Sequence, residues 1–233
     1  PPLRRPSAPQ QAAASRTFIF EQSGKVTYDR SASATLVAST TRALGYLDDA
    51  LATSADNVSQ SDIQDILDQF TSGTYDLVTS TFGEPSDVDG NGKVIFLFTH
   101  LVDQVGDVAG FYASGSLFDV DRGGDGNLAD MMYISPTRPP ESYQSLLAHE
   151  YQHLINFYQH AMARDGDAEE TWLNEALSHY TEDLVDGHIA GGNAQLVDTY
   201  LQHPGLFTLT SDVSPLYGGN RGAAYLFLRG LVD

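Results

Sequence analysis

The apolar and polar positions in the first part of the chain predict strands and then a helix. Residues 1–16 are rich in Pro, Ala and Gln and lack an apolar pattern, so we expect a disordered lead or linker. Residues 17–20 and 25–28 are rich in β-branched and aromatic side chains and flank a Ser–Gly pair, which predicts two strands around a turn. Residues 34–51 combine leucines with many alanines, and we interpret them as a helix.

Helices and strands are also predicted in the middle of the chain. Residues 61–70 begin with a Ser cap and an acidic first turn, and a further helix is predicted for 75–82. The run Val-Ile-Phe-Leu-Phe at 94–98 is apolar at every position, which favours a buried strand. Residues 110–118 are interpreted as an edge strand, and 131–134 as a strand that leads into the next helix.

The later chain has helical periodicity. Apolar residues between 141 and 164 recur at i, i+3, i+4 and i+7, and neither Pro nor Gly interrupts them. A second helix is predicted to begin near the acidic residues 167–170 and to end at Gly187. A last amphipathic run reaches residue 233 without a capping signal, so we expect that a longer protein was truncated at this point.

The predicted helix over 141–164 contains the sequence HExxH. His149 and His153 are four positions apart, close to one helical turn, so both imidazoles can reach one metal ion. Glu150 projects beside them, where its carboxylate can take a proton from a water that the metal activates. The chain has no cysteine, which leaves histidine and carboxylate side chains as zinc ligands.

A third ligand decides whether this motif is a zinc site. The extended pattern HExxHxxGxxH fails, because Asn156 and Gln159 stand at its Gly and third His positions. The pattern with an Asp shortly before Tyr–Gly also fails, because Asp212 lies too far upstream. Glu175 lies 22 positions after His153 in an Asn–Glu pair, which leaves room for a turn and an antiparallel helix. Two histidines, one glutamate and an open fourth position form a catalytic type of zinc site.

The chain resembles the secreted bacterial hyicolysin-type neutral metalloproteases, and more distantly other gluzincins, in two sequence blocks. These blocks are Ala-His-Glu-Tyr-Gln-His-Leu-Ile-Asn-Phe at 148–157 and Trp-Leu-Asn-Glu-Ala-Leu-Ser-His-Tyr-Thr-Glu-Asp at 172–183. The resemblance implies an α+β, zincin-like fold, in which the active-site helix lies between two lobes. A mixed twisted sheet with helices would form the N-terminal lobe, residues 17–163, and mostly helices the C-terminal lobe, residues 164–233.

The same resemblance implies roles for further residues. Asn174 would hold the zinc helix by side-chain hydrogen bonds. His179 stands where the thermolysin pattern has an Asp that orients a zinc-binding His. It could either donate a hydrogen bond that supports a zinc ligand, or bind the zinc itself. Tyr217 matches a tyrosine whose hydroxyl donates to the oxyanion in aminopeptidase-type gluzincins, with Tyr225 as the second candidate. An extended substrate adds as a strand above the metal in zincins, which assigns substrate binding to Gly110, Phe111, Tyr112 and Ala113.

Two acidic stretches predict calcium binding. Residues 87–93 contain Asp-x-Asp-x-Asn-Gly, the first half of an EF-hand loop, but Phe98 occupies the position of the closing Glu. Either another segment completes this site, or the stretch is a plain turn before a strand. In residues 119–130, crowded carboxylates are costly without a cation, which favours calcium over the alternative of a solvated polar loop. The candidate calcium ligands are Asp87, Asp89, Asn91, Asp119, Asp121, Asp125, Asn127 and Asp130.

Composition narrows the classes of partner. The formal net charge is −19, from 31 acidic and 12 basic residues, which argues against nucleic acid because phosphate binding needs a basic face. No apolar run is long enough to span a bilayer. Hydrophobic residues make up 41% of the chain, which is ordinary for a globular protein with a core of its own.

Together these features predict a secreted, monomeric zinc endopeptidase that cleaves extracellular proteins, with Zn²⁺ at its site and Ca²⁺ elsewhere. Two alternatives stay open. A zinc aminopeptidase would need an acidic anchor for the substrate amine, and no Gly-x-Met-x-Asn-type segment precedes the zinc helix. A non-enzymatic, calcium-stabilised surface or adhesion domain would not need Glu150.

Overall fold

The computed structural model describes residues 12–20, 31–51, 58–105, 108–210 and 218–233. The chain divides into two compact units. The first contains Pro1–Asp76 and Pro85–Tyr143, and the second contains Leu77–Glu84 and Gln144–Asp233. Each unit is described by itself.

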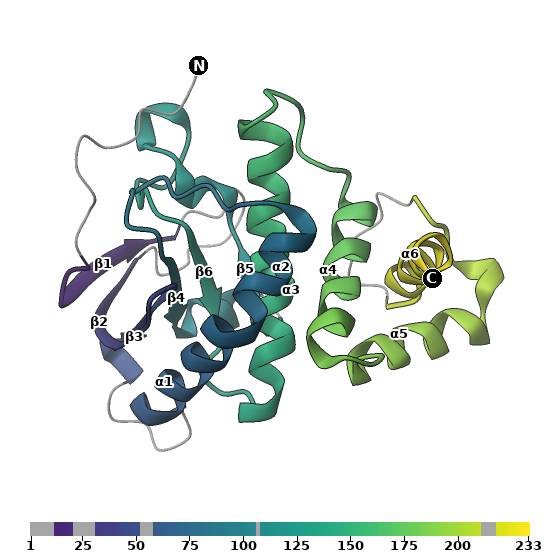
Figure 1. Cartoon of the computed structure of the whole chain (residues 1–233), viewed down its shortest axis with the longest axis horizontal. Helices are drawn as coiled ribbons and strands as arrows, with labels where there is room; N and C mark the ends of the chain where they lie inside the picture. Colours follow the sequence, from purple (N-terminus) through teal and green to yellow (C-terminus); the bar gives the residue numbers. More distant parts are fainter. Residues whose placement is uncertain (1–11, 21–30, 52–57, 106–107, 211–217) are drawn as a thin grey trace. The chain divides into compact units, whose positions relative to one another are not determined.

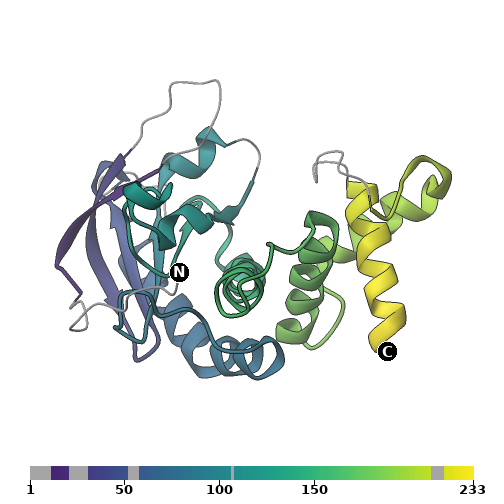
Figure 2. The same cartoon turned by 90° about the horizontal axis from the view of Figure 1, so that it is seen from above.

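A six-stranded mixed sheet forms the centre of the first unit (Figure 1). Its strand order is β1-β2-β3-β4-β6-β5, and it appears as a curved layer in Figure 2. The pairs β3–β4 and β4–β6 are parallel, whereas β1–β2, β2–β3 and β5–β6 are antiparallel. The strands are β1 (Ser15–Ile19), β2 (Ser31–Ser39), β3 (Ala43–Asp48), β4 (Val94–Phe98), β5 (Gly110–Tyr112) and β6 (Met131–Ile134).

The central strands explain the apolar runs of the sequence. Every residue of β3, β4 and β6 is buried, as expected for parallel strands that are covered on both faces. Helix α1 (Gln60–Gln69) packs against β2 and β3. Gly45 of β3 permits this approach, because a Cβ atom there would lie 2.7 Å from Ile63 and 3.0 Å from Leu67.

Several elements of the first unit confirm the predictions. The strands predicted at 94–98 and 131–134 are β4 and β6, and β5 lies at an edge of the sheet as expected. The predicted edge strand is shorter than expected, however, because Ser114–Leu117 forms a 3-10 turn. Helix α1 starts at Gln60, one residue earlier than predicted, because Ser59 caps it and forms a capping box with Asp62.

Two predictions for the first unit were wrong. Residues 34–51 form β2 and β3 instead of a helix: exposed and buried side chains alternate along most of β2, and β3 is entirely buried. The predicted disordered lead reaches too far, because Ser15 and Arg16 belong to β1 and pair with β2. The strand predicted at 25–28 lies outside the described residues.

The second unit is helical (Figure 1). It contains α3 (Tyr143–Phe157) from Gln144 onward, α4 (Thr171–Asp186), α5 (Gly191–Gln202), α6 (Gly218–Val232) and most of α2 (Tyr75–Phe82). Shorter helical turns across both units are Asp49–Leu51, Phe70–Thr74, His100–Gln104, Ser114–Leu117, Val120–Arg122, Pro140–Ser142, Tyr158–Met162 and Pro204–Leu206.

Helices α2, α3, α4 and α6 agree with the sequence predictions, whereas α5 was not predicted. Helix α4 ends at Gly187, which has the left-handed φ of 70° that favours glycine after a helix. Asp186 at the end of α4 accepts hydrogen bonds from Ser145 near the start of α3, so the two helices run antiparallel. No helix in the described ranges is both long and apolar enough to cross a membrane.

The α+β class is confirmed, and the division into lobes stays a prediction. The second compact unit contains α3 from Gln144 together with the later helices, whereas the predicted boundary at residue 163 placed that helix with the sheet.

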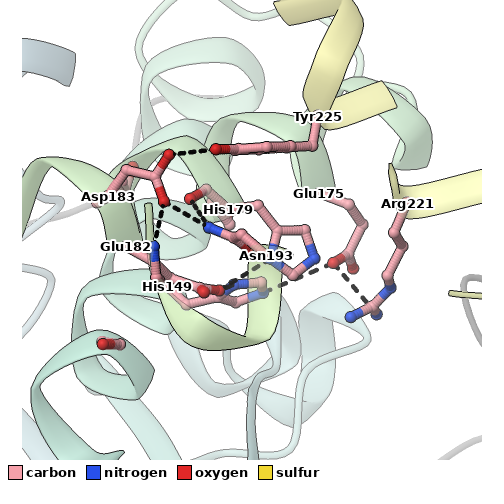
Figure 3. A network of polar contacts seen from close by, with 12 residues as sticks. His149, Glu175, His179, Glu182, Asp183, Asn193, Arg221 and Tyr225 are labelled. Atoms are coloured by element: carbon pink, nitrogen blue, oxygen red, sulfur yellow. Dashed lines mark hydrogen bonds and ion pairs between the residues drawn. The ribbon is translucent and has the colours of Figure 1, made fainter. Parts of the chain in front are cut away.

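Asp183 joins the three later helices (Figure 3). The backbone N–H of Ala190 (2.9 Å) and the amide of Asn193 (2.8 Å) donate to its Oδ1. Tyr225 and Arg229 of α6 donate to its Oδ2, the latter at 2.7 Å. The carboxylate side chain is only 4% exposed, so these donors replace the water that it loses on burial.

We predict that Asp183→Asn destabilises the second unit by about 3 kcal/mol, because Oδ2 is replaced by an amide that cannot accept from Tyr225 and Arg229. Trp172, the only tryptophan of the chain, lies in α4 and reports unfolding of this unit by fluorescence in urea. The control is Asp198→Asn on the exposed side of α5, which should change the free energy of unfolding by at most about 0.5 kcal/mol. Equal unfolding free energies for the two variants would contradict this role of Asp183.

Candidate metal centre

Helix α3 presents its two motif histidines on one side. The rings of His149 and His153 contact edge to face at 4.8 Å, and their Nε2 atoms are 3.1 Å apart. Both residues are less than a tenth exposed. Glu150 lies beside them, is also buried, and its negative charge acts on His149. The four-residue spacing therefore produces the convergence that the sequence predicts.

Helix α4 brings the predicted third ligand to these histidines. Glu175 Oε2 is 3.6 Å from His149 Nε2, and Glu175 Oε1 is 3.8 Å from His153 Nε2. Asn174, next to Glu175, accepts a hydrogen bond of 2.6 Å from Asn156 of α3. Antiparallel pairing and this amide bond together position the carboxylate opposite the two imidazoles.

The donor set fits a tetrahedral metal ion. Ligand atoms that lie 2.0–2.2 Å from a tetrahedral centre are separated from each other by about 3.3–3.6 Å. The two Nε2 atoms are 3.1 Å apart, and different oxygens of Glu175 lie 3.6 Å from His149 Nε2 and 3.8 Å from His153 Nε2, which is close to that range. One ligand atom from each residue lies within 4.8 Å of the other two. His149, His153 and Glu175 thus supply two nitrogens and one carboxylate at metal-binding distance, and leave a fourth position for another group.

Electrostatics at the site favour one shared proton on the histidine pair. Burial lowers the pKa of His149, but hydrogen bonds to Glu175 and Glu182 outweigh burial and raise it. Burial and the neighbouring His149 lower the pKa of His153. Because a metal ligand must present an unprotonated nitrogen, metal binding has to displace the proton that the histidine pair holds.

Glu182 contacts the candidate centre and was missed by sequence reasoning. Its Oε1 lies 2.6 Å from His149 Nδ1 and 2.9 Å from His179 Nδ1 (Figure 3). Glu175, His179 and Glu182 follow the spacing i, i+4 and i+7, which places all three on one face of α4. That spacing is a signal in the sequence that could have identified Glu182.

Arg221 is a second residue that sequence reasoning missed. It lies in the first turn of α6, and its Nη2 is 3.2 Å from Glu175 Oε2. The guanidinium contributes to lowering the pKa of Glu175, after the two histidines. A permanent positive charge therefore keeps the third candidate ligand ionised.

The tyrosine candidates have different outcomes. Tyr225 donates its hydroxyl to Asp183, so its hydrogen is engaged in the helix junction and the residue is unsuited to oxyanion binding. Tyr217 lies outside the described residues.

Three of the candidate calcium ligands converge in the first unit. Carboxylate oxygens of Asp87, Asp89 and Asp130 lie within 4.8 Å of one another. Asp130 belongs to a second segment and accepts from Ser86 and from the backbone N–H of Val88 at 2.6 Å. Burial raises the pKa of Asp89 to about 6 and that of Asp130 to about 7, and repulsion by neighbouring carboxylates adds to both shifts.

The other candidate calcium ligands are used differently. Asn91 donates its amide to Asp89 at 2.6 Å. Asp125 accepts a hydrogen bond from Ser116 of the turn Ser114–Leu117. The side-chain amide of Asn127 accepts from the backbone N–H of Ile19 and donates to its carbonyl, which joins this loop to β1. Asp119 and Asp121 are outside the cluster of three within the described ranges.

Comparison with known proteins gives one informative similarity. No protein-family model matches the chain. The chain is 32% identical over 147 residues to a neutral metalloprotease, ShpI, of Staphylococcus hyicus. The matched part is 56% of this chain and 32% of that protein, so the chain spans about a third of the length of this relative. The similarity is to a metalloprotease, as the two histidines and the carboxylate lead one to expect.

Proposed function

We propose that this chain is the catalytic part of a zinc-dependent endopeptidase of the gluzincin type. The observation that carries the proposal is the convergence of His149, His153 and Glu175, whose ligand atoms lie within 4.8 Å of one another, with Glu150 beside them. The similarity to a neutral metalloprotease supports it. We also propose that the protein is secreted, is monomeric and cleaves extracellular proteins.

The ligand set favours zinc in a catalytic role. Two imidazoles and one carboxylate suit Zn²⁺, and a chain without cysteine cannot form a thiolate site. Structural zinc sites use four protein ligands, whereas three converge in the group His149, His153 and Glu175; a second group of three, His149, His179 and Glu182, shares His149 with it. A bound zinc ion would polarise the scissile carbonyl and make water acidic enough to lose a proton near neutral pH.

Glu150 is the proposed general base. Its carboxylate would accept the proton of the attacking water on one oxygen, and would then donate that proton to the nitrogen of the leaving amine. Its burial in α3 keeps competing bulk water away and holds it one residue from His149. Arg221 and Glu182 would keep the ligands Glu175 and His149 in place through their ion pair and hydrogen bond.

The proposals for substrate contacts rest on the resemblance of the sequence alone. Tyr217 is proposed to donate to the oxyanion, and the edge strand β5 with Ala113 to pair with an extended substrate. Both assignments stay predictions.

We predict that the purified chain holds about one zinc ion and cleaves an internal bond of a quenched peptide with a blocked N-terminus. Glu150→Gln should retain the zinc and lose about 10²- to 10⁴-fold in kcat, because only the base is removed. The matched control is Glu141→Gln, an exposed glutamate before α3 that should leave activity unchanged. Elemental analysis and the peptide assay are run on the same samples.

The possible failures point to different parts of the account. A folded chain without zinc would overturn the site. Zinc without hydrolysis in the wild type would overturn the endopeptidase and favour the adhesion-domain alternative. Cleavage restricted to peptides with a free amine would favour the aminopeptidase.

A second proposal concerns the first unit. We infer that Asp87, Asp89 and Asp130 bind Ca²⁺, which takes carboxylate oxygens. The support is that a second segment supplies Asp130 to the half-motif at 87–93. Two buried carboxyl groups whose pKa is raised are also destabilising when ionised, unless a cation neutralises them.

We predict that calcium raises the melting temperature of the zinc-loaded protein at pH 7.5, and that Asp89→Asn abolishes most of this increase. Stabilisation reaches about 2.7 kcal/mol at a calcium concentration 100 times Kd. The control is Asp121→Asn, outside the cluster, which should keep the full calcium response. A wild-type melting temperature that does not respond to calcium would contradict the proposal. Residues 87–93 would then be a plain turn before β4.

The same cluster sets the pH dependence of the calcium-free protein. Asp89 and Asp130 titrate at about 6 and 7 when folded, but near 3.9 when unfolded. At these two carboxyl groups the folded state therefore binds more protons between about pH 4 and 7, so their contribution to stability falls as the pH rises through that window. His153, whose pKa is lowered to about 4 by burial, contributes in the opposite direction. Calcium should suppress this loss, which the same melting experiment measures.

A further inference from the structure

We propose that Glu182 is a positioning residue that sets which nitrogen of His149 faces the metal; this inference rests on the proposed function, because it takes His149 as a ligand. Glu182 projects from α4 and His149 from α3. One helix would thus supply both a ligand, Glu175, and the group that orients a ligand on the neighbouring helix.

The hydrogen bond fixes the donor and the acceptor. His149 Nδ1 and Glu182 Oε1 are 2.6 Å apart, slightly shorter than the range of about 2.7–2.9 Å for charge-assisted N–H···O⁻ bonds. Glu182 Oε1 lies against the Nδ1 atoms of two histidines, and a carboxylate oxygen accepts hydrogen bonds, so Nδ1 of His149 is the donor that carries the hydrogen.

The other nitrogen of the ring then faces the metal position. With Nδ1 held as a donor to Glu182, the lone pair available to a metal on His149 is that of Nε2. This is the atom that lies 3.1 Å from His153 Nε2 and 3.6 Å from Glu175 Oε2. Rotating the imidazole to present Nδ1 instead would break the bond to Glu182 within a buried site, which costs binding free energy.

His179 has a lesser part in this arrangement. Its Nδ1 also lies against Glu182 Oε1, at 2.9 Å, and its ring packs edge to face on His149 at 4.9 Å. The Nε2 of His179 is buried and has no hydrogen-bond partner within the described part of the chain. His179 therefore steadies the Glu182 carboxylate, whereas Glu182 acts on the ligand directly.

This order of roles predicts an order of effects. Glu182→Met has a side chain of similar length that accepts no strong hydrogen bond, and it should weaken zinc binding about 10- to 100-fold in a chelator competition. Glu182→Gln keeps an acceptor oxygen without the charge, and its zinc affinity should fall between those of Glu182→Met and the wild type. His179→Phe leaves the bond of 2.6 Å in place and should weaken zinc binding less than Glu182→Met.

Two spectroscopic readouts separate positioning from general damage. In the metal-free wild type, ¹H–¹⁵N spectra of the imidazoles should show a low-field proton on His149 Nδ1, and Glu182→Met should lose it. The visible absorption bands of the cobalt-substituted protein should shift in Glu182→Met, because the ligand geometry changes. A purely structural role would lower the melting temperature and leave both spectra unchanged.

Asp183→Asn is the matched control. Asp183 follows Glu182 on the same helix, is more buried than Glu182 (4% against 13% of the side chain exposed), and in the described ranges makes no hydrogen bond or ion pair with the three candidate ligands. It should lower stability yet leave zinc affinity and the cobalt spectrum as in the wild type. If Asp183→Asn does not fold, Glu141→Gln, at an exposed residue, replaces it as the control.

The outcomes distinguish this inference from the proposed function. A wild type that binds no zinc would overturn the proposed function first. A wild type that binds zinc, together with a folded Glu182→Met of unchanged zinc affinity and cobalt spectrum, would overturn the positioning role alone.

Discussion

Charged and polar groups that are buried between α3 and α4 set the main physical constraint on the second unit. An isolated carboxylate or imidazolium would lose several kcal/mol of hydration on burial. Each of these groups therefore has a partner of opposite character: Glu175 contacts both histidines and Arg221, and Glu182 contacts His149 and His179. A divalent cation at the centre would complete this balance, because it replaces the proton that the two histidines share.

The constraint explains why the surrounding helices are tied together by polar bonds. A site that holds ligands within a few tenths of an ångström needs helices that do not slide. The Asn156–Asn174 bond fixes α3 against α4 at the level of Glu175. One turn beyond His179, Asp183 ties α4 to α5 and α6, and α6 in turn carries Arg221 back to Glu175. The Asn156–Asn174 bond thus lies next to the third ligand, whereas the contacts of Asp183 stabilise the helices without touching a candidate ligand.

Secondary structure and site residues could be predicted from the sequence where a stretch had one clear residue spacing or motif. The four-residue spacing in HExxH, the Asn–Glu pair and the apolar run at 94–98 each have one straightforward structural interpretation, and the structure contains the corresponding elements. Residues 34–51 were mistaken for a helix because alanine favours helices, whereas burial in the sheet decided their structure. Glu182 was missed because its role depends on α3, which a search along one helix does not include. Arg221 was missed because its contact crosses between two helices that are far apart in sequence.

The most direct test of the account is the anomalous X-ray signal of zinc in crystals of this chain, recorded on both sides of the zinc absorption edge. The account predicts one strong peak in the second unit, with His149 Nε2, His153 Nε2 and a Glu175 oxygen within about 2.0–2.2 Å of it. A peak elsewhere in the chain, or coordination by His179 in place of Glu175, would contradict the account.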